Sequence, residues 1–154
     1  MPLALTLAAI VQSMVALPGA TACSCLPKPP PCEHYSKVPL VFIGTVTKVL
    51  VTNQHGRVVR VRMRVDRAYK GVRESSLILR DDGMCDGPDL QLGQQYLMYT
   101  FRPEAGDIPS RGCTRSRHLK YAAEDLKFLK SLAAGPLVPH VYGRVQRRSI
   151  VDYG

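Results

Sequence analysis

The sequence predicts a mainly β fold with one C-terminal helix, and three observations support this. Four or five short segments rich in β-branched residues follow one another along the chain. Gly44 lies inside the first segment, where a small barrel needs a bulge or a sharp bend. A single stripe of helical period follows the last segment. The order and number of elements indicate a small five-stranded antiparallel barrel of the OB type, although periodicity alone would also allow another small α+β sandwich.

Size and charge limit the classes of protein that fit. The 154 residues suffice for one domain, and 45% hydrophobic with 21% charged residues exclude a disordered or collagen-like chain. Lys and Arg number 21 against 12 Asp and Glu, so the formal net charge is +9. This excess favours anionic partners without choosing among them.

Residues 1–22 are predicted to be a signal peptide. No side chain from Pro2 to Ala22 is charged, and the apolar run ends at Pro18 before the small residues of Ala20-Thr21-Ala22. Cleavage there makes Cys23 the first mature residue and leaves no membrane span, so we expect a protein that is secreted or located in the cell envelope. The alternatives are a retained anchor and a lipoprotein signal, since a cysteine follows the cleavage site directly.

The mature chain is divided into a folded domain over 23–134 and a linker, or the start of a further β-domain, over 135–154. The proline-rich run at 26–31 predicts a stiff extended connector. Strands are predicted at 38–52, 59–69, 75–80 and 95–101, with room for a short fifth strand in the loop 102–112. From Leu119 the period becomes helical, and the stripe ends before Gly135.

The second predicted strand carries a row of arginines. Val59, Val61, Met63 and Val65 alternate with charged residues, which is typical of a strand with one buried and one solvated face. Arginine rows on strands are usually plain solvated faces, and binding of an acidic polymer is the alternative. No aromatic residue interrupts the row, so we do not expect a nucleic-acid partner. The row consists of Arg57, Arg60, Arg62 and Arg64.

Catalytic and metal-binding patterns are not evident in the sequence. The four histidines do not form the HExxH spacing of zinc enzymes, and no G-x-S-x-G or Cys/His signature is present. We therefore expect neither an enzyme nor a cofactor or metal site of its own. In an exported chain the five cysteines are expected to form disulfides, which leaves one of them odd.

A series of motifs resembles a known family. Cys23-Ser24-Cys25 is followed by a third cysteine after prolines, a strand ending in Tyr-Lys-Gly, and the loop MCDGPDL. A G-x-x-Y-L strand, Cys113 and the helix AAEDLKFLKSL complete the series. The segment 23–134 resembles the netrin-like N-terminal domain of tissue inhibitors of metalloproteinases, especially bacterial secreted proteins with that domain.

The resemblance implies an OB barrel and a disulfide-clamped N-terminus, with Cys23 paired to Cys85, Cys25 to Cys113, and Cys32 outside both pairs. It also implies that the α-amino nitrogen and carbonyl oxygen of Cys23 chelate the zinc of a target protease, while Ser24 enters its specificity pocket. The chain departs from the family at Cys32, whose spacing from Cys25 is short, and at an additional residue, Asp86.

These observations leave three functions open. The first is a secreted metalloendopeptidase inhibitor, whose partner is a zinc protease. The second is a non-inhibitory extracellular interaction module that binds a protein or an acidic polymer. The third is a lipid-anchored envelope protein, which would have an acylated Cys23 and so no free amine.

Overall fold

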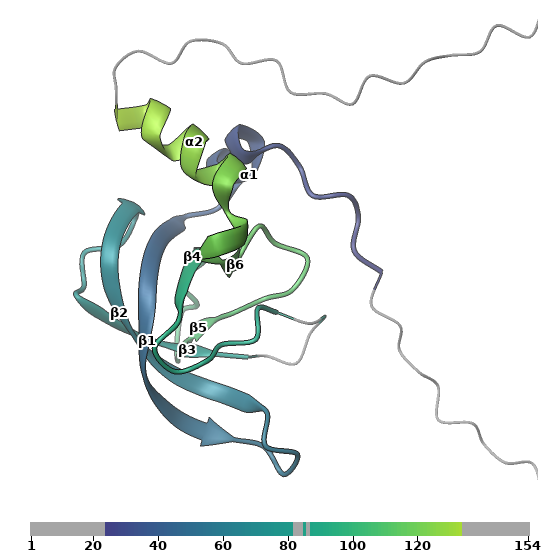
Figure 1. Ribbon diagram of the computed structural model, residues 1–154, viewed down its shortest axis with the longest axis vertical. Coiled ribbons are helices and arrows are strands. Elements are labelled where there is room, and N and C mark those ends of the chain that lie inside the picture. Colours follow the sequence, from purple (N-terminus) through teal and green to yellow (C-terminus); the bar gives the residue numbers. More distant parts are fainter. Residues whose placement is uncertain (1–23, 82–84, 86, 134–154) are drawn as a thin grey trace, which may run out of the picture.

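The computed structural model describes residues 24–81, 85 and 87–133, and shows a mainly β fold (Figure 1). Within these residues, six strands form one curled sheet in the order β5-β3-β2-β1-β4-β6, accompanied by two α-helices and a 3₁₀ turn. The predicted segments 1–22 and 135–154 lie outside the described residues. The elements are α1 (Pro31–Lys37), β1 (Leu40–Thr52), β2 (Val58–Lys70), β3 (Ser76–Arg80), β4 (Gln95–Thr100), β5 (Ile108–Pro109), β6 (Arg117–His118), η1 (Leu119–Tyr121) and α2 (Ala123–Ala133).

The four longer predicted strands are confirmed, with small shifts at their ends. The strand count differs from the predicted five, because the two-residue β6 gives no periodic signal and the sequence does not indicate it. The sheet is also not wholly antiparallel, since β5 pairs with β3 in parallel through Leu79 and Ile108. β1 is central and pairs with both β2 and β4.

The prediction of one helix was wrong. The helix α1 begins at Pro31, the last residue of the predicted extended connector, and the His34 amide donates to the Pro30 carbonyl at 3.0 Å. Proline is tolerated there because backbone N–H groups in the first helical turn have no acceptor within the helix, so the N–H that proline lacks costs no hydrogen bond. The predicted C-terminal helix is present, but it starts at Ala123 and not at Leu119, after a 3₁₀ turn.

Two apolar clusters lie on opposite faces of the sheet. One fills the concave side, with Phe42, Met63 and Met98 fully buried. The other lies between the sheet and the helices and includes Val41, Tyr99 and Leu129. Figure 1 shows α1 and α2 together at one end of the molecule, with the tip of the β1–β2 hairpin at the opposite end.

Gly44 bends β1, and the predicted irregularity there is confirmed. The β1–β2 register shifts between Ile43 and Gly44. A Cβ on Gly44 would lie 2.6 Å from Met63 Cγ and 2.8 Å from the Arg64 carbonyl oxygen. Only glycine lets the two strands approach this closely, and the bend helps to curl the sheet.

Candidate functional site

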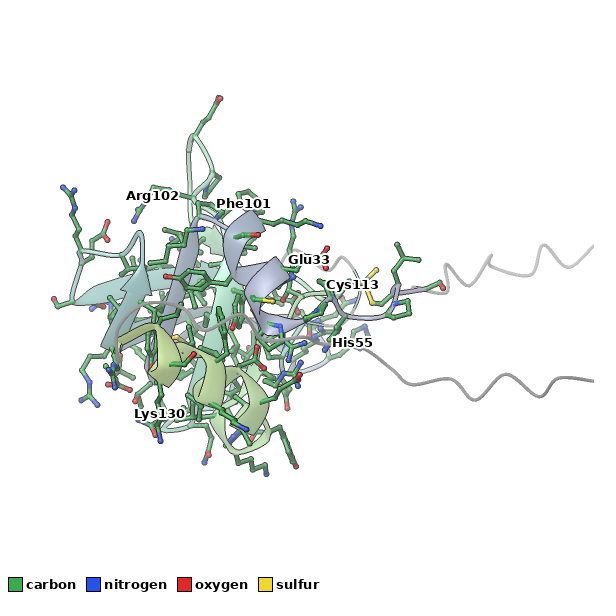
Figure 2. All side chains as sticks on the ribbon, turned by 90° about the horizontal axis from the view of Figure 1, so that it is seen from above. Glu33, His55, Phe101, Arg102, Cys113 and Lys130 are labelled. Atoms are coloured by element: carbon green, nitrogen blue, oxygen red, sulfur yellow. A yellow bond between two sulfur atoms is a disulfide. The ribbon has the colours of Figure 1, made fainter. Side chains whose placement is uncertain are left out.

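The first described residues form an exposed segment that a disulfide holds to the domain. Cys25 and Cys113 are bonded, with their Cα atoms 5.1 Å apart, which is the pair implied by the resemblance. Figure 2 shows this sulfur–sulfur bond beside Cys113 at the margin of the domain. The bond closes a separation of 88 residues, worth about 4.6 kcal/mol in the chain-entropy account.

Of the other described cysteines, one is disulfide-bonded and one is free. Cys85 is also disulfide-bonded. Its predicted partner, Cys23, lies outside the described residues, so that pair stays a prediction. Cys32 is exposed on α1 and is a free cysteine, as expected for the residue outside both pairs.

A second anchor holds the segment four residues further on. The Pro29 carbonyl accepts a hydrogen bond from Arg115 Nη1 at 2.8 Å. Between the two anchors the side chains of residues 26–28 are exposed, and that of Leu26 is 86% accessible. The segment is therefore fixed at Cys25 and Pro29 and presents an apolar side chain to solvent between them.

Arg115 can hold Pro29 because a buried ionic cluster fixes its own position. Its Nε and Nη2 donate to the two carboxylate oxygens of Asp125 at 2.5 and 3.0 Å, and Nη2 also reaches Glu124 at 2.5 Å. The Tyr99 hydroxyl donates to Asp125 Oδ1 at 2.9 Å. Asp125 is completely buried and the Arg115 side chain is 5% exposed. We call Arg115, Asp125, Glu124 and Tyr99 the Arg115 cluster.

The pKa values in the Arg115 cluster follow from burial and pairing. Burial, followed by the negative charge of Asp125, raises the pKa of the Tyr99 hydroxyl, so this group stays protonated and donates. Burial alone would lower the pKa of Arg115, but its hydrogen bonds to Asp125 and Glu124 outweigh burial and raise it. At neutral pH the Tyr99 hydroxyl is therefore protonated and Arg115 is charged.

The two loops that carry Cys85 and Cys113 have constrained backbones and pack closely against each other. Cys85 and Cys113 both have positive φ angles, 46° and 55°, which is uncommon for residues with a side chain. A Cβ on Gly87 would lie 2.5 Å from the Ser110 carbonyl oxygen, so the chain after Cys85 runs against the chain before Cys113. Both cysteines are consequently held on neighbouring loops.

The predicted arginine row is largely paired with carboxylates. Arg60 binds Asp107 through two hydrogen bonds of 2.6 and 3.1 Å. Arg57 and Arg64 form ion pairs of 2.7 and 2.9 Å with Asp81 and Asp66. Arg62 is exposed. The row therefore has much less uncompensated charge than its sequence indicates, and its predicted binding of an acidic polymer stays a prediction.

A hollow that sequence reasoning missed lies between β4, β6, η1 and the loop before β4. Its volume is about 480 Å³, and its lining includes Arg117, His118, Lys120 and Tyr121. These residues come from one stretch of chain, whereas Asp89 and Gln94 come from the opposite loop. No sequence motif joins the two stretches, because the β4–β6 pairing brings them together.

Within the described residues, no three His, Cys, Asp or Glu side chains gather as a metal ion would require. No helix in the same part of the chain has the length and apolar character to cross a membrane. No protein-family model matches the chain, and no curated protein matches it.

Proposed function

We propose that the protein is a secreted inhibitor of zinc metalloendopeptidases, and not an enzyme, that acts through the free N-terminus of mature Cys23. The supporting observation is the exposed segment after that residue, which is anchored at Cys25 by a disulfide and at Pro29 by Arg115. A donor presented by such a doubly anchored segment loses little conformational entropy on binding.

The chemistry fits a catalytic zinc ion as target. Such an ion keeps one coordination position open for a nitrogen or oxygen donor. The α-amino nitrogen and carbonyl oxygen of Cys23 would displace the zinc-bound water, and Ser24 would enter the adjacent pocket. An N-terminal amine with a pKa of roughly 7.7–8.0 is partly deprotonated at neutral pH and able to coordinate. Leu26, whose side chain is exposed, would add an apolar contact.

The finer fold assignment is part of this proposal: we infer an OB-type barrel of the netrin-like kind. Its support is the pairing of β1 with both β2 and β4, together with the parallel β3–β5 pair. The two sides of the curled sheet also approach each other, because Thr100 Oγ1 at the end of β4 donates to the Pro109 carbonyl in β5 at 2.6 Å. Secretion is supported by the Cys25–Cys113 disulfide, since such bonds persist in oxidising compartments.

The test compares two forms of the exported protein. One starts at Cys23 with a free amine, as verified by intact mass and N-terminal sequencing. The other has one additional alanine before Cys23, which shifts the donor by about 3.5 Å, well beyond a zinc–nitrogen bond of about 2.1 Å. We expect the first form to inhibit members of a panel of zinc endopeptidases, and the extended form to lose inhibition with an unchanged melting temperature.

Leu26→Ser supplies a matched variant within the segment. Since this side chain is exposed, the substitution should leave stability unchanged and weaken inhibition. If the form with a free Cys23 inhibits no protease of the panel, the proposal is wrong and the non-inhibitory interaction module replaces it.

A further inference from the structure

The hollow beside β6 contains two cations that form no ion pair with a carboxylate of the described chain. Arg117 donates only to main-chain carbonyl oxygens, those of Arg115 at 3.1 Å and Tyr121 at 3.5 Å. Lys120 Nζ lies 4.8 Å from the centre of the Tyr121 ring. Neither side chain forms an ion pair with an acidic residue of the described chain. Arg60 and Arg64 on β2, in contrast, each have a carboxylate partner.

The positive charge extends beyond the lining toward the N-terminal segment. Partial burial, and then the neighbouring charges of Arg117 and Arg115, lower the pKa of Lys28. Lys28 therefore lies within the electrostatic reach of Arg117. An oxyanion entering the hollow would relieve repulsion between cations and would gain charge-assisted hydrogen bonds.

The rest of the lining suits a polyhydroxylated molecule. The Asp89 carboxylate accepts from Gln91 at 2.8 Å and retains capacity to accept from hydroxyl groups. Gln94 Oε1 is 3.0 Å from His118 Nε2, and since His118 Nδ1 accepts from the Lys120 amide, Nε2 carries the proton. The Gln94 side-chain oxygen therefore accepts from His118, and the side-chain N–H groups of Gln94 have no acceptor among the described residues and remain available. A few convergent polar groups of this kind fix the orientation of a small ligand in a pocket.

The aromatic residue at the rim distinguishes a sugar from a simple anion. The Tyr121 side chain is 66% exposed, although an aromatic ring of this size gains by burial. Its accessible surface can pack against the apolar C–H face of a pyranose ring, while Arg117 and Lys120 bind the anionic substituent. An acidic peptide composed of Asp and Glu would use the cations but has no alcohol groups for Asp89 and no pyranose face for Tyr121.

We propose that this hollow binds an acidic carbohydrate, namely a sugar unit bearing a carboxylate or a sulfate group, through Arg117, Lys120 and the exposed ring of Tyr121. The proposal concerns a site other than the Cys23 terminus and does not depend on protease inhibition. It also locates anion binding on a different part of the domain from the arginine row of β2.

Binding is tested by titration calorimetry of the mature protein with trigalacturonate, sulfated maltotriose, neutral maltotriose and triglutamate. We expect at least one of the two acidic sugars to bind more tightly than neutral maltotriose and triglutamate. The better acidic sugar identifies whether the anionic group is a carboxylate or a sulfate. Because no protease is present, the result is independent of the proposed inhibition.

A pair of double variants provides the matched control. Arg117→Gln with Lys120→Gln removes two charges from the hollow, and Lys48→Gln with Arg62→Gln removes two exposed charges from paired positions of β1 and β2. The first should weaken acidic-sugar binding at least about tenfold, the effect of losing one charge-assisted hydrogen bond. The second should change binding less than about twofold, because neither Lys48 nor Arg62 lines the hollow and both charges are exposed to screening solvent.

Tyr121→Ala, which alters an exposed side chain, should weaken acidic-sugar binding and leave the melting temperature unchanged. If Arg117→Gln impairs folding, Lys120→Gln combined with Tyr121→Ala tests the same site with Arg117 intact. Three results would each overturn the proposal: equal binding of triglutamate, an equal loss in the β1–β2 control, or unchanged affinity in Tyr121→Ala.

Discussion

The Arg115 cluster allows a quantitative prediction about stability. Asp125→Asn preserves the shape of the side chain but removes the charge that compensates Arg115. The Arg115 side chain is only 5% exposed, so water replaces little of the lost interaction. Breaking a buried pair in this way costs about 3–5 kcal/mol. Because Glu124 still contacts Arg115, we expect the lower end, about 3 kcal/mol.

Replacing Arg115, the other member of the pair, tests the same interaction with Asp125. Arg115→Met leaves the buried Asp125 carboxylate without its cation, and we again expect a loss of about 3 kcal/mol. In the double variant both charges are gone, and the amide oxygen introduced by Asp125→Asn can still accept from the Tyr99 hydroxyl. The double variant should therefore be less destabilised than the sum of the two single variants, with a coupling of at least about 2 kcal/mol.

Urea denaturation followed by circular dichroism measures all four proteins at pH 7, with disulfides intact. The coupling energy is the decisive quantity, because the free energy of unfolding of each single variant also includes packing changes. Additivity within about 0.5 kcal/mol would refute it, since this is the behaviour of independent sites. Additivity would mean that solvent stabilises the charge of Arg115 and that of Asp125 independently of their pairing.

Two further predictions concern the sheet and the helix α1. Gly44→Ala should destabilise the domain by about 1–3 kcal/mol, because its Cβ overlaps Met63 and the Arg64 carbonyl oxygen; a melting temperature equal to that of the parent protein would contradict this. Burial and then Arg115 lower the pKa of His34, so the unfolded chain binds its proton more readily and stability falls as pH drops below about 6.5. His34→Gln should flatten this dependence in denaturation series between about pH 7.5 and 5, and an unchanged slope would exclude His34 as its source.

The strands could be predicted where one face is solvated. In β2, Val61 and Met63 are fully buried while Arg62 and Arg64 are exposed, so the period of two is visible in the sequence. β4 is buried on both faces, because alternate residues enter the two different apolar clusters. Its run of apolar residues identifies a strand but does not tell which side chain faces the helices.

Local sequence patterns were not sufficient to predict the helices fully. The prolines before α1 indicate an extended chain, yet Pro31 occupies the one turn of a helix that accepts proline. Tyr35 then packs edge-on against Phe128 with ring centres 5.7 Å apart, and this contact stabilises the short helix from outside its own sequence. Asp125 carried a usable signal, since it is three residues after Ala122 and four before Leu129 on the buried side of α2.

The charges of the candidate sites could not be assigned from sequence alone. Arg60 and Asp107 are 47 positions apart in the sequence, and the β2–β3 and β3–β5 pairings together bring them into contact. The row on β2 therefore looks more cationic in the sequence than it is in the fold. Arg117 and Lys120 give no pattern in the sequence, but they remain without a carboxylate partner among the described residues.

One stretch of chain connects these features. Cys113 holds Cys25, Arg115 holds Pro29, and Arg117 lines the hollow, so alternate residues of a single segment serve the exposed N-terminal chain and the proposed sugar site. Asp125→Asn would weaken the Pro29 anchor while the disulfide still holds Cys25. If rigidity of the segment contributes to inhibition, this variant should inhibit less well at temperatures where it is fully folded, although it leaves Cys23 and Ser24 unaltered. Inhibition equal to that of the parent protein would show that the disulfide alone positions the donor.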